Sequence, residues 1–194
     1  KKRGIAVALI ASGNYLSGVI WSPFIAYILT SGDWREIYLI LALVISFVVI
    51  PLSFYLRKKT TEIRSAPSDI KNYLQTPKIA ISGRHLQFFL GVAGVGCCIA
   101  MAMPQVHIVA YCVGLGYGPT VGAEMLSLML ACGVVSRISF GICADRLGGF
   151  YTLILSSTLQ MLSLFLFLPF NGMVSLYVVS AIFGLSQGGI VPSY

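Results

Sequence analysis

One arginine, Arg137, stands in an apolar stretch of the chain and offers the clearest chemistry in the sequence. A guanidinium group keeps its charge at accessible pH and presents a planar fork of donors that suits a carboxylate. Spacing places Gly133, Arg137 and Gly141 on one helical stripe, a narrow face suited to close helix contact. Because an ionisable residue inside a membrane helix is functional by default, we favour contact with an anionic substrate. In the alternative, Arg137 snorkels to the interface and pairs with Asp145 or a lipid phosphate.

Two further ionisable residues could exchange protons. His107 follows Pro104, which we expect to kink its helix, and an imidazole there could couple a proton to a substrate. An equally weighted alternative is a neutral histidine that bonds a neighbouring helix or lies exposed. Glu124 stands at the start of the next apolar run, where an acid stabilises a helix N-terminus. That structural role is the favoured one, and Glu124 is kept as a candidate proton carrier.

Polar amides inside the apolar runs complete the candidates for substrate contact. Asn14, Gln160 and Gln187 are each surrounded by apolar residues, so we expect their side chains to face the interior of a helix bundle. Hydrogen bonding between helices is the favoured role for all three. Asn14 and Gln160 are also kept as candidates for binding the substrate.

The sequence carries no motif of an enzyme or of a metal site. It contains no HExxH pair, no G-x-S-x-G elbow and no P-loop lysine pattern. Five cysteines lack CxxC or His/Cys metal spacing, so we predict packing roles for Cys97, Cys98, Cys112, Cys132 and Cys143. We therefore expect no enzymatic activity, no cofactor and no metal. Without a P-loop, secondary transport is favoured over an ATP-driven pump.

Long apolar runs are the elements that must position these residues. Hydrophobic residues make up 57% of the 194 and charged residues only 10%, against about 25% in soluble domains. The predicted fold is an all-α polytopic bundle of transmembrane helices, because the apolar runs approach the ~20 residues that span a bilayer. The first run lacks the cleavage site of a signal peptide. The expected spans are residues 5–30, 36–56, 86–110, 121–142, 150–169 and 173–192.

The distribution of positive charge predicts how the helices are oriented. With alternating helices, all but one of the 13 Lys and Arg residues fall on one side, and only Arg35 falls on the other. Such asymmetry is typical of cytoplasmic loops, so both ends of this chain are expected in the cytoplasm. The net charge of +7 is thereby explained by topology, with weak attraction to anionic lipid, and not by nucleic-acid binding.

A polar linker divides the chain. Residues 1–56 hold two spans, residues 57–85 form a basic cytoplasmic linker with a short helix expected near residues 68–75, and residues 86–194 hold four spans. The chain begins at a basic cluster without an initiator Met and stops just after a helix. We therefore expect a fragment of a longer protein.

On these residues the chain resembles the major facilitator superfamily. The run from Gly141 through Asp145 and Arg146 to Gly148 matches the cytoplasmic G-x-x-x-D-R-x-G pattern between helices eight and nine of that family. Asp33-Trp34-Arg35 is similar to the outer connection between helices five and six, and the linker falls where the two six-helix halves join. The resemblance implies that the six spans are helices five to ten of a twelve-helix fold. It also implies that Gly141, Asp145, Arg146 and Gly148 form a conformational latch; the alternative is a plain surface turn.

Within the superfamily, the nearest similarity is to the monocarboxylate porters and oxalate–formate antiporters, whose arginine on helix eight has the spacing of Arg137. The resemblance implies alternating-access transport of a small organic anion, a monocarboxylate, with proton coupling or exchange and no fixed oligomeric state. A porter for another solute, with Arg137 structural, is one alternative. A transport-incompetent membrane sensor or scaffold is the other. We expect an integral protein of a bacterial inner membrane.

Overall fold

The computed structural model describes residues 3–56 and 83–189, and within them every element of regular structure is an α-helix. Five helices are long and apolar enough to cross a membrane, and the last is a shorter apolar helix. This confirms the predicted all-α transmembrane fold. The helices are α1 (Arg3–Ser31), α2 (Trp34–Leu56), α4 (Gly83–Gly114), α5 (Pro119–Leu147), α6 (Gly149–Leu166) and α7 (Met173–Gln187). The helix expected near residues 68–75 lies outside the described residues.

The connection between α5 and α6 is shorter than the sequence predicted. We expected Asp145 and Arg146 in a turn between two helices, but both lie in the last turn of α5, which continues to Leu147. Gly148 alone reverses the chain, with φ 86°, and its N–H donates to the carbonyl of Ala144 at 3.1 Å. A positive φ of this size suits glycine, which has no Cβ, and this explains how one residue replaces a loop.

Contacts divide the described residues into two compact units. One unit holds α1, α4 from Gly94 onward, α5, α6 and α7; the other holds α2 and the start of α4 up to Ala93. In the second unit, Arg35 of α2 pairs with Asp33, which precedes the helix, and its Nη1 lies 3.1 Å from Asp33 Oδ2. The candidate site lies entirely in the first unit.

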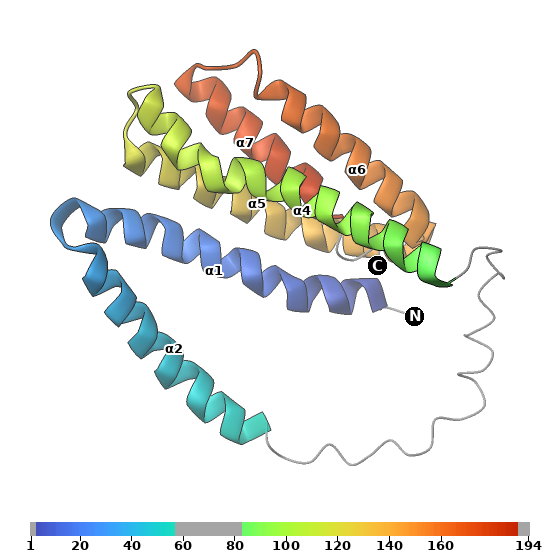
Figure 1. The fold of residues 1–194 in the computed structure, drawn as a ribbon, viewed down its shortest axis with the longest axis horizontal. Helices are drawn as coiled ribbons and strands as arrows, with labels where there is room; N and C mark the ends of the chain where they lie inside the picture. The colour runs from blue at the N-terminus through green and yellow to red at the C-terminus, as the bar shows by residue number, and fades with distance from the viewer. Residues whose placement is uncertain (1–2, 57–82, 190–194) are drawn as a thin grey trace. The chain divides into compact units, whose positions relative to one another are not determined.

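Helix α5 is the centre of that first unit (Figure 1). Helix α1 packs along one side of it, α7 packs along another, and α6 packs against α7 and α5. Helices α1 and α5 run antiparallel, since Ser22 of α1 bonds the carbonyl of Ala123 near the start of α5, and Ile5 bonds Asp145 near its end. Every position along α5 therefore faces a defined position on α1.

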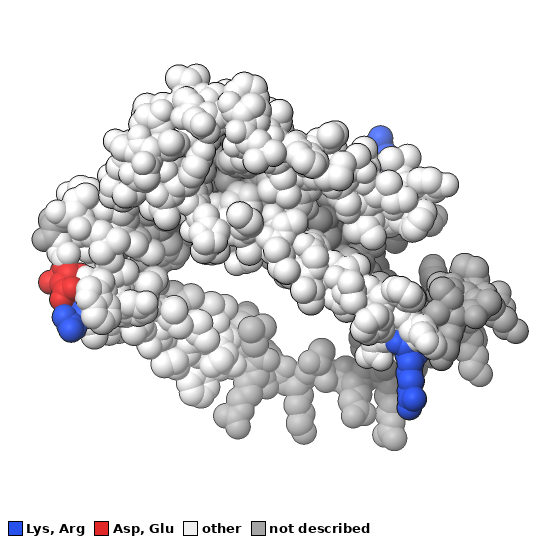
Figure 2. All heavy atoms as spheres, turned by 45° about the horizontal axis from the view of Figure 1, so that its top comes forward, with Lys and Arg blue, Asp and Glu red and all other residues white. Residues whose placement is uncertain are grey.

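The outer surface of the helices is apolar, as expected of a protein in lipid. Large hydrophobic side chains are exposed on every helix, for example Phe47 at 77% and Val174 at 77%. The face drawn in Figure 2 shows few charged side chains among its described atoms. Such a surface is unfavourable in water and favourable in a bilayer.

Candidate functional site

Arg137 is buried at the contact between α5 and α1. Its side chain is 5% exposed, and Nη1 donates to the backbone carbonyl of Ala11 at 2.6 Å. The guanidinium carbon lies 4.0 Å from the ring centroid of Tyr15, in a cation–π contact. A desolvated contact of this kind is worth about 2 kcal/mol. The arginine thus reaches across to α1, which supplies a carbonyl and an aromatic face.

Glycine at position 133 allows side chains from two other helices to pack closely against α5, one turn before this arginine. A Cβ there would lie 3.3 Å from the ring of Tyr15 and 3.2 Å from Nε2 of Gln187. Gln187 is fully buried on α7, and its Oε1 accepts a hydrogen bond from Nε2 of Gln105 on α4 at 2.8 Å. Side chains from α1, α4, α5 and α7 therefore meet around one glycine. We call Tyr15, Gln105, Arg137 and Gln187 the arginine cluster.

Two donors of the arginine cluster have no hydrogen-bond partner. They are Nε of Arg137 and Nε2 of Gln187. Among the described residues, the other buried side-chain nitrogen or oxygen atoms without a hydrogen-bond partner are Gln160 Nε2 and Ser180 Oγ. Leaving a buried donor unpaired costs about 1–3 kcal/mol. A ligand that offers acceptor oxygens would satisfy both donors of the cluster.

The sequence identified only part of this cluster. Arg137 was its strongest candidate, and Gln187 was expected to hydrogen-bond between helices, which it does. Tyr15 and Gln105 were not singled out. Gln105 carried the same signal as the other amides, a polar side chain in an apolar run, whereas the position of Tyr15 depends on contacts with residues more than 80 positions away.

The other predicted substrate contacts lie elsewhere. Asn14 is exposed on α1. Gln160 is 3% exposed on α6, and its carbonyl accepts a hydrogen bond from Ser163, which also bonds Ser186 of α7. The structure therefore places Gln160 at the α6–α7 contact.

The two predicted proton carriers lie apart from each other. His107 is exposed on α4 and lines a hollow of about 480 Å³ together with Tyr111 and Asn171, whose side chains are hydrogen-bonded at 2.7 Å. Glu124, near the start of α5, accepts a hydrogen bond from Tyr177 of α7 at 2.6 Å. Glu124 therefore ties two helices together at the end of α5 opposite to Asp145.

The residues of the predicted latch lie at the other end of α5. Asp145 Oδ2 accepts a hydrogen bond from the backbone N–H of Ile5, in the first turns of α1, at 3.2 Å. A carboxylate is favourable there, because the free N–H groups at a helix N-terminus carry partial positive charge. Arg146 lies exposed in the last turn of α5, where a cation is favourable for the opposite reason. Gly141 is buried and Gly148 makes the turn.

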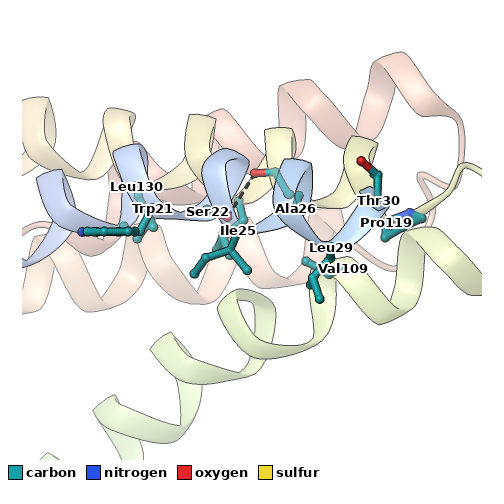
Figure 3. Close-up of a pocket in the computed structure, with 12 residues that line it drawn as sticks. Trp21, Ser22, Ile25, Ala26, Leu29, Thr30, Val109, Pro119 and Leu130 are labelled. Carbon is teal, nitrogen blue, oxygen red and sulfur yellow. Dashed lines mark hydrogen bonds between the residues drawn. The ribbon is translucent and has the colours of Figure 1, made fainter. Parts of the chain in front are cut away.

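An apolar hollow of about 540 Å³ lies along α1 toward the start of α5 (Figure 3). Trp21, Ile25 and Leu29 of α1, Val109 of α4 and Leu130 of α5 line it. Its polar feature is the bond from Ser22 Oγ to the carbonyl of Ala123 at 3.4 Å, drawn as a dashed line in Figure 3. Among the described residues, no group of three or more His, Cys, Asp or Glu could hold a metal ion.

Comparisons with known proteins agree with this architecture. A model of the Major Facilitator Superfamily matches residues 1–194. The chain is 24% identical to monocarboxylate transporter 13 of Rattus norvegicus over 99% of the chain and 44% of that protein. It is 22% identical to an MFS-type transporter of Aspergillus fumigatus (97% of the chain, 47% of that protein) and 24% identical to an agnestins efflux protein of Paecilomyces divaricatus (98% and 42%). The chain spans a little under half the length of these relatives, and no solved structure shows significant similarity.

Proposed function

The chain belongs to the major facilitator superfamily, and on that premise we propose that the protein is a secondary active transporter of a small organic anion, a monocarboxylate. It moves this anion by alternating access, coupled to protons or to exchange. The similarity to a rat monocarboxylate transporter supports the class of substrate. The curated relatives come from an animal and from fungi, so the bacterial membrane expected from the sequence is not part of the proposal.

The observation that carries the proposal is the buried arginine. Arg137 keeps its charge in an apolar bundle, with one hydrogen bond to a carbonyl and an aromatic ring as its described partners. Neither partner neutralises the charge, so a carboxylate gains a full charge–charge interaction by binding there. On the register that the family implies, α1 belongs to one half of the transporter and α5 to the other. Substrates of such porters bind between the halves.

We further propose that Asp145 stabilises the state in which the inner ends of α1 and α5 are joined. Its hydrogen bond to Ile5 spans two helices that the family register assigns to different halves. Breaking this contact would let the inner ends separate, as a rocking cycle requires. His107 and Glu124 remain the proposed proton carriers.

Uptake measurements test the proposal directly. Full-length protein in proteoliposomes would be offered radiolabelled acetate, lactate, pyruvate and benzoate, with and without a pH gradient. We expect uptake of at least one of them, and acceleration by the gradient would identify proton coupling. Arg137→Lys keeps the charge but loses the fork of donors, so it should lower uptake at least tenfold. Normal uptake by this variant, or no flux of any of the four anions, would overturn the proposal.

A second candidate is a porter of a larger apolar solute, with Arg137 in a structural role. The apolar hollow of about 540 Å³ favours it, as does the similarity to a protein described as an agnestins efflux protein. In this case Leu130→Trp, which fills the hollow, would block transport of the bulky apolar solute, and Arg137→Lys would leave that transport unaffected. The monocarboxylate proposal predicts that Leu130→Trp leaves lactate uptake intact and Arg137→Lys does not.

A further inference from the structure

The amide of Gln187 has a fixed orientation. Its Oε1 accepts the hydrogen bond from Nε2 of Gln105 at 2.8 Å, so the oxygen faces α4 and the NH₂ group faces away from α4. This NH₂ group has no partner, although the side chain is 0% exposed. It lies 3.2 Å from the place where a Cβ on Gly133 would stand. Gln105 thus holds Gln187 as a hydrogen-bond donor directed toward Gly133 of α5.

The second unpaired donor is on the same face of α5 as Gly133. Arg137 follows Gly133 by one helical turn on α5, and its Nε–H is buried without a partner. Tyr15 connects the two donors, since its ring lies 3.3 Å from the Gly133 position and 4.0 Å from the guanidinium carbon. Two buried N–H donors that contact or flank the same tyrosine, with no acceptor for either, favour a ligand that brings two acceptors.

From this arrangement we infer that Gln187 is a second donor to the substrate carboxylate, beside Arg137, and that Gln105 is a positioning residue that keeps the Gln187 amide in its donor orientation. The inference rests on the proposed function. One carboxylate oxygen accepts from Arg137 and the other from Gln187, which matches the two acceptor oxygens of a carboxylate. A neutral carboxamide offers only one acceptor oxygen and no charge, so the site discriminates against it.

Apolar substitutions of equal length separate the two roles. Gln187→Met removes the donor and should raise the KM for uptake about tenfold with little change in Vmax, as expected for one hydrogen bond to a charged group. Gln105→Met leaves the donor but frees its orientation, and should raise KM about threefold. If Gln105 acts only through Gln187, the double variant has the same KM as Gln187→Met. The double variant removes both amides together, so neither is left buried without the other as its hydrogen-bond partner. It is therefore the variant expected to fold best.

The control is Ser180→Ala, which removes another buried side-chain atom on α7 that has no partner. It should keep the wild-type KM. All variants would be measured as full-length protein in proteoliposomes with the best transported of acetate, lactate, pyruvate and benzoate, and with its amide as competitor. We expect the amide to compete weakly against wild type, and its relative potency to increase in Gln187→Met.

The outcomes separate this inference from the proposal beneath it. Defective uptake by Arg137→Lys together with a wild-type KM for folded Gln187→Met would overturn the inference alone. Additive KM increases in the double variant would overturn the positioning role of Gln105. No flux of any of the four anions would overturn the proposed function, and the inference with it.

Discussion

Helix α5 contacts α7 and α1 in two different ways. Against α7 the backbones approach closely: a Cβ on Gly184 would collide with the carbonyl of Met129 and would lie 2.8 Å from Cβ of Cys132. A Cβ on Gly188 would lie 2.5 Å from Oγ of Ser136. This oxygen also accepts a hydrogen bond from the backbone N–H of Gly188 at 3.2 Å. Small residues at such contacts supply association energy in lipid through van der Waals packing.

The contact of α5 with α1 is the more extensive of the two, and along it side chains cross to backbone carbonyls. Each bridge is a single hydrogen bond: Ser127 to Val19 at 2.6 Å, Ser22 to Ala123 at 3.4 Å, and Arg137 to Ala11 at 2.6 Å. Gly18 of α1 also faces α5, but its neighbour is the flexible end of the Leu130 side chain and not a backbone. Bonds of this kind can be released one at a time.

The difference indicates which contact can open in the proposed transport cycle. Interlocked backbones make α5 and α7 a rigid pair, because separating them would leave gaps along the whole contact. The α1–α5 contact has the arginine cluster in its middle and the Asp145 bond at one end, so opening it exposes the proposed substrate site. We therefore expect substitutions at the first contact to impair folding and substitutions at the second to alter transport.

The largest expected effect is that of Gly184→Leu. Its side chain has no room against Met129 and Cys132, so we expect a loss of stability of about 3 kcal/mol or more and little folded protein in detergent. Gly13→Leu is the matched control, because nothing lies within 4 Å of a Cβ at Gly13. Thermal unfolding followed by size-exclusion chromatography measures both. Equal melting temperatures for the two variants would contradict a closely packed α5–α7 contact.

The next largest effect should come from Tyr15 at the second contact. Tyr15→Leu removes the ring beneath the guanidinium, a contact worth about 1–2 kcal/mol, and should raise the KM for uptake roughly 5- to 30-fold with normal folding. Tyr15→Phe keeps the ring and loses only the 3.4 Å contact of the hydroxyl with Met101 sulfur, so its KM should stay within about twofold of wild type. If Tyr15→Leu folded poorly, the α1–α5 contact would be needed for folding, and α1 and α5 would form a rigid pair as α5 and α7 do.

Asp145→Asn should shift the ends of α1 and α5 that Asp145 and Ile5 join apart, without lowering stability. Charge at a helix N-terminus contributes about 0.3–1 kcal/mol, so we expect a roughly two- to fivefold increase in the separated population. Spin labels at the exposed positions Val7 and Ile142, in a cysteine-free background, would report the distance distribution. Asp33→Asn, whose carboxylate pairs with Arg35, is the control and should leave the distribution unchanged.

Much of the fold followed from hydropathy, because a helix that crosses lipid must be both long and apolar. The predicted span 5–30 coincides with the apolar part of α1, whereas the end of α5 was placed five residues early because its last turn is polar. Polarity marks where a helix leaves the lipid, and the helix itself ends only where Gly148 takes a positive φ.

The sequence predicted only those residues of the site that stand out by their own type, and not the residues that contact them. Arg137 is conspicuous in any apolar run, but its partners come from positions 126 and 122 residues away, and no local pattern encodes those pairings. The same holds for Asp145 and Ile5, which are 140 residues apart. Small residues in the sequence predicted close packing between helices. The register of the helices decides which glycine contacts a backbone and which contacts a flexible side chain, and the sequence does not show that register.

The smallest effect, and the finest test of the comparison, is that of Ser127→Ala. Its hydroxyl bridges α5 to the carbonyl of Val19 on α1, and hydrogen bonds between membrane helices average about 0.6 kcal/mol. We therefore expect the separated population to increase less than threefold, with an unchanged melting temperature. Ser139→Ala is the control, since its hydroxyl bonds Val135 within α5. If Ser127→Ala destabilised the protein as Gly184→Leu does, the α1–α5 contact would be as rigid as the α5–α7 contact, and alternating access would need a different hinge.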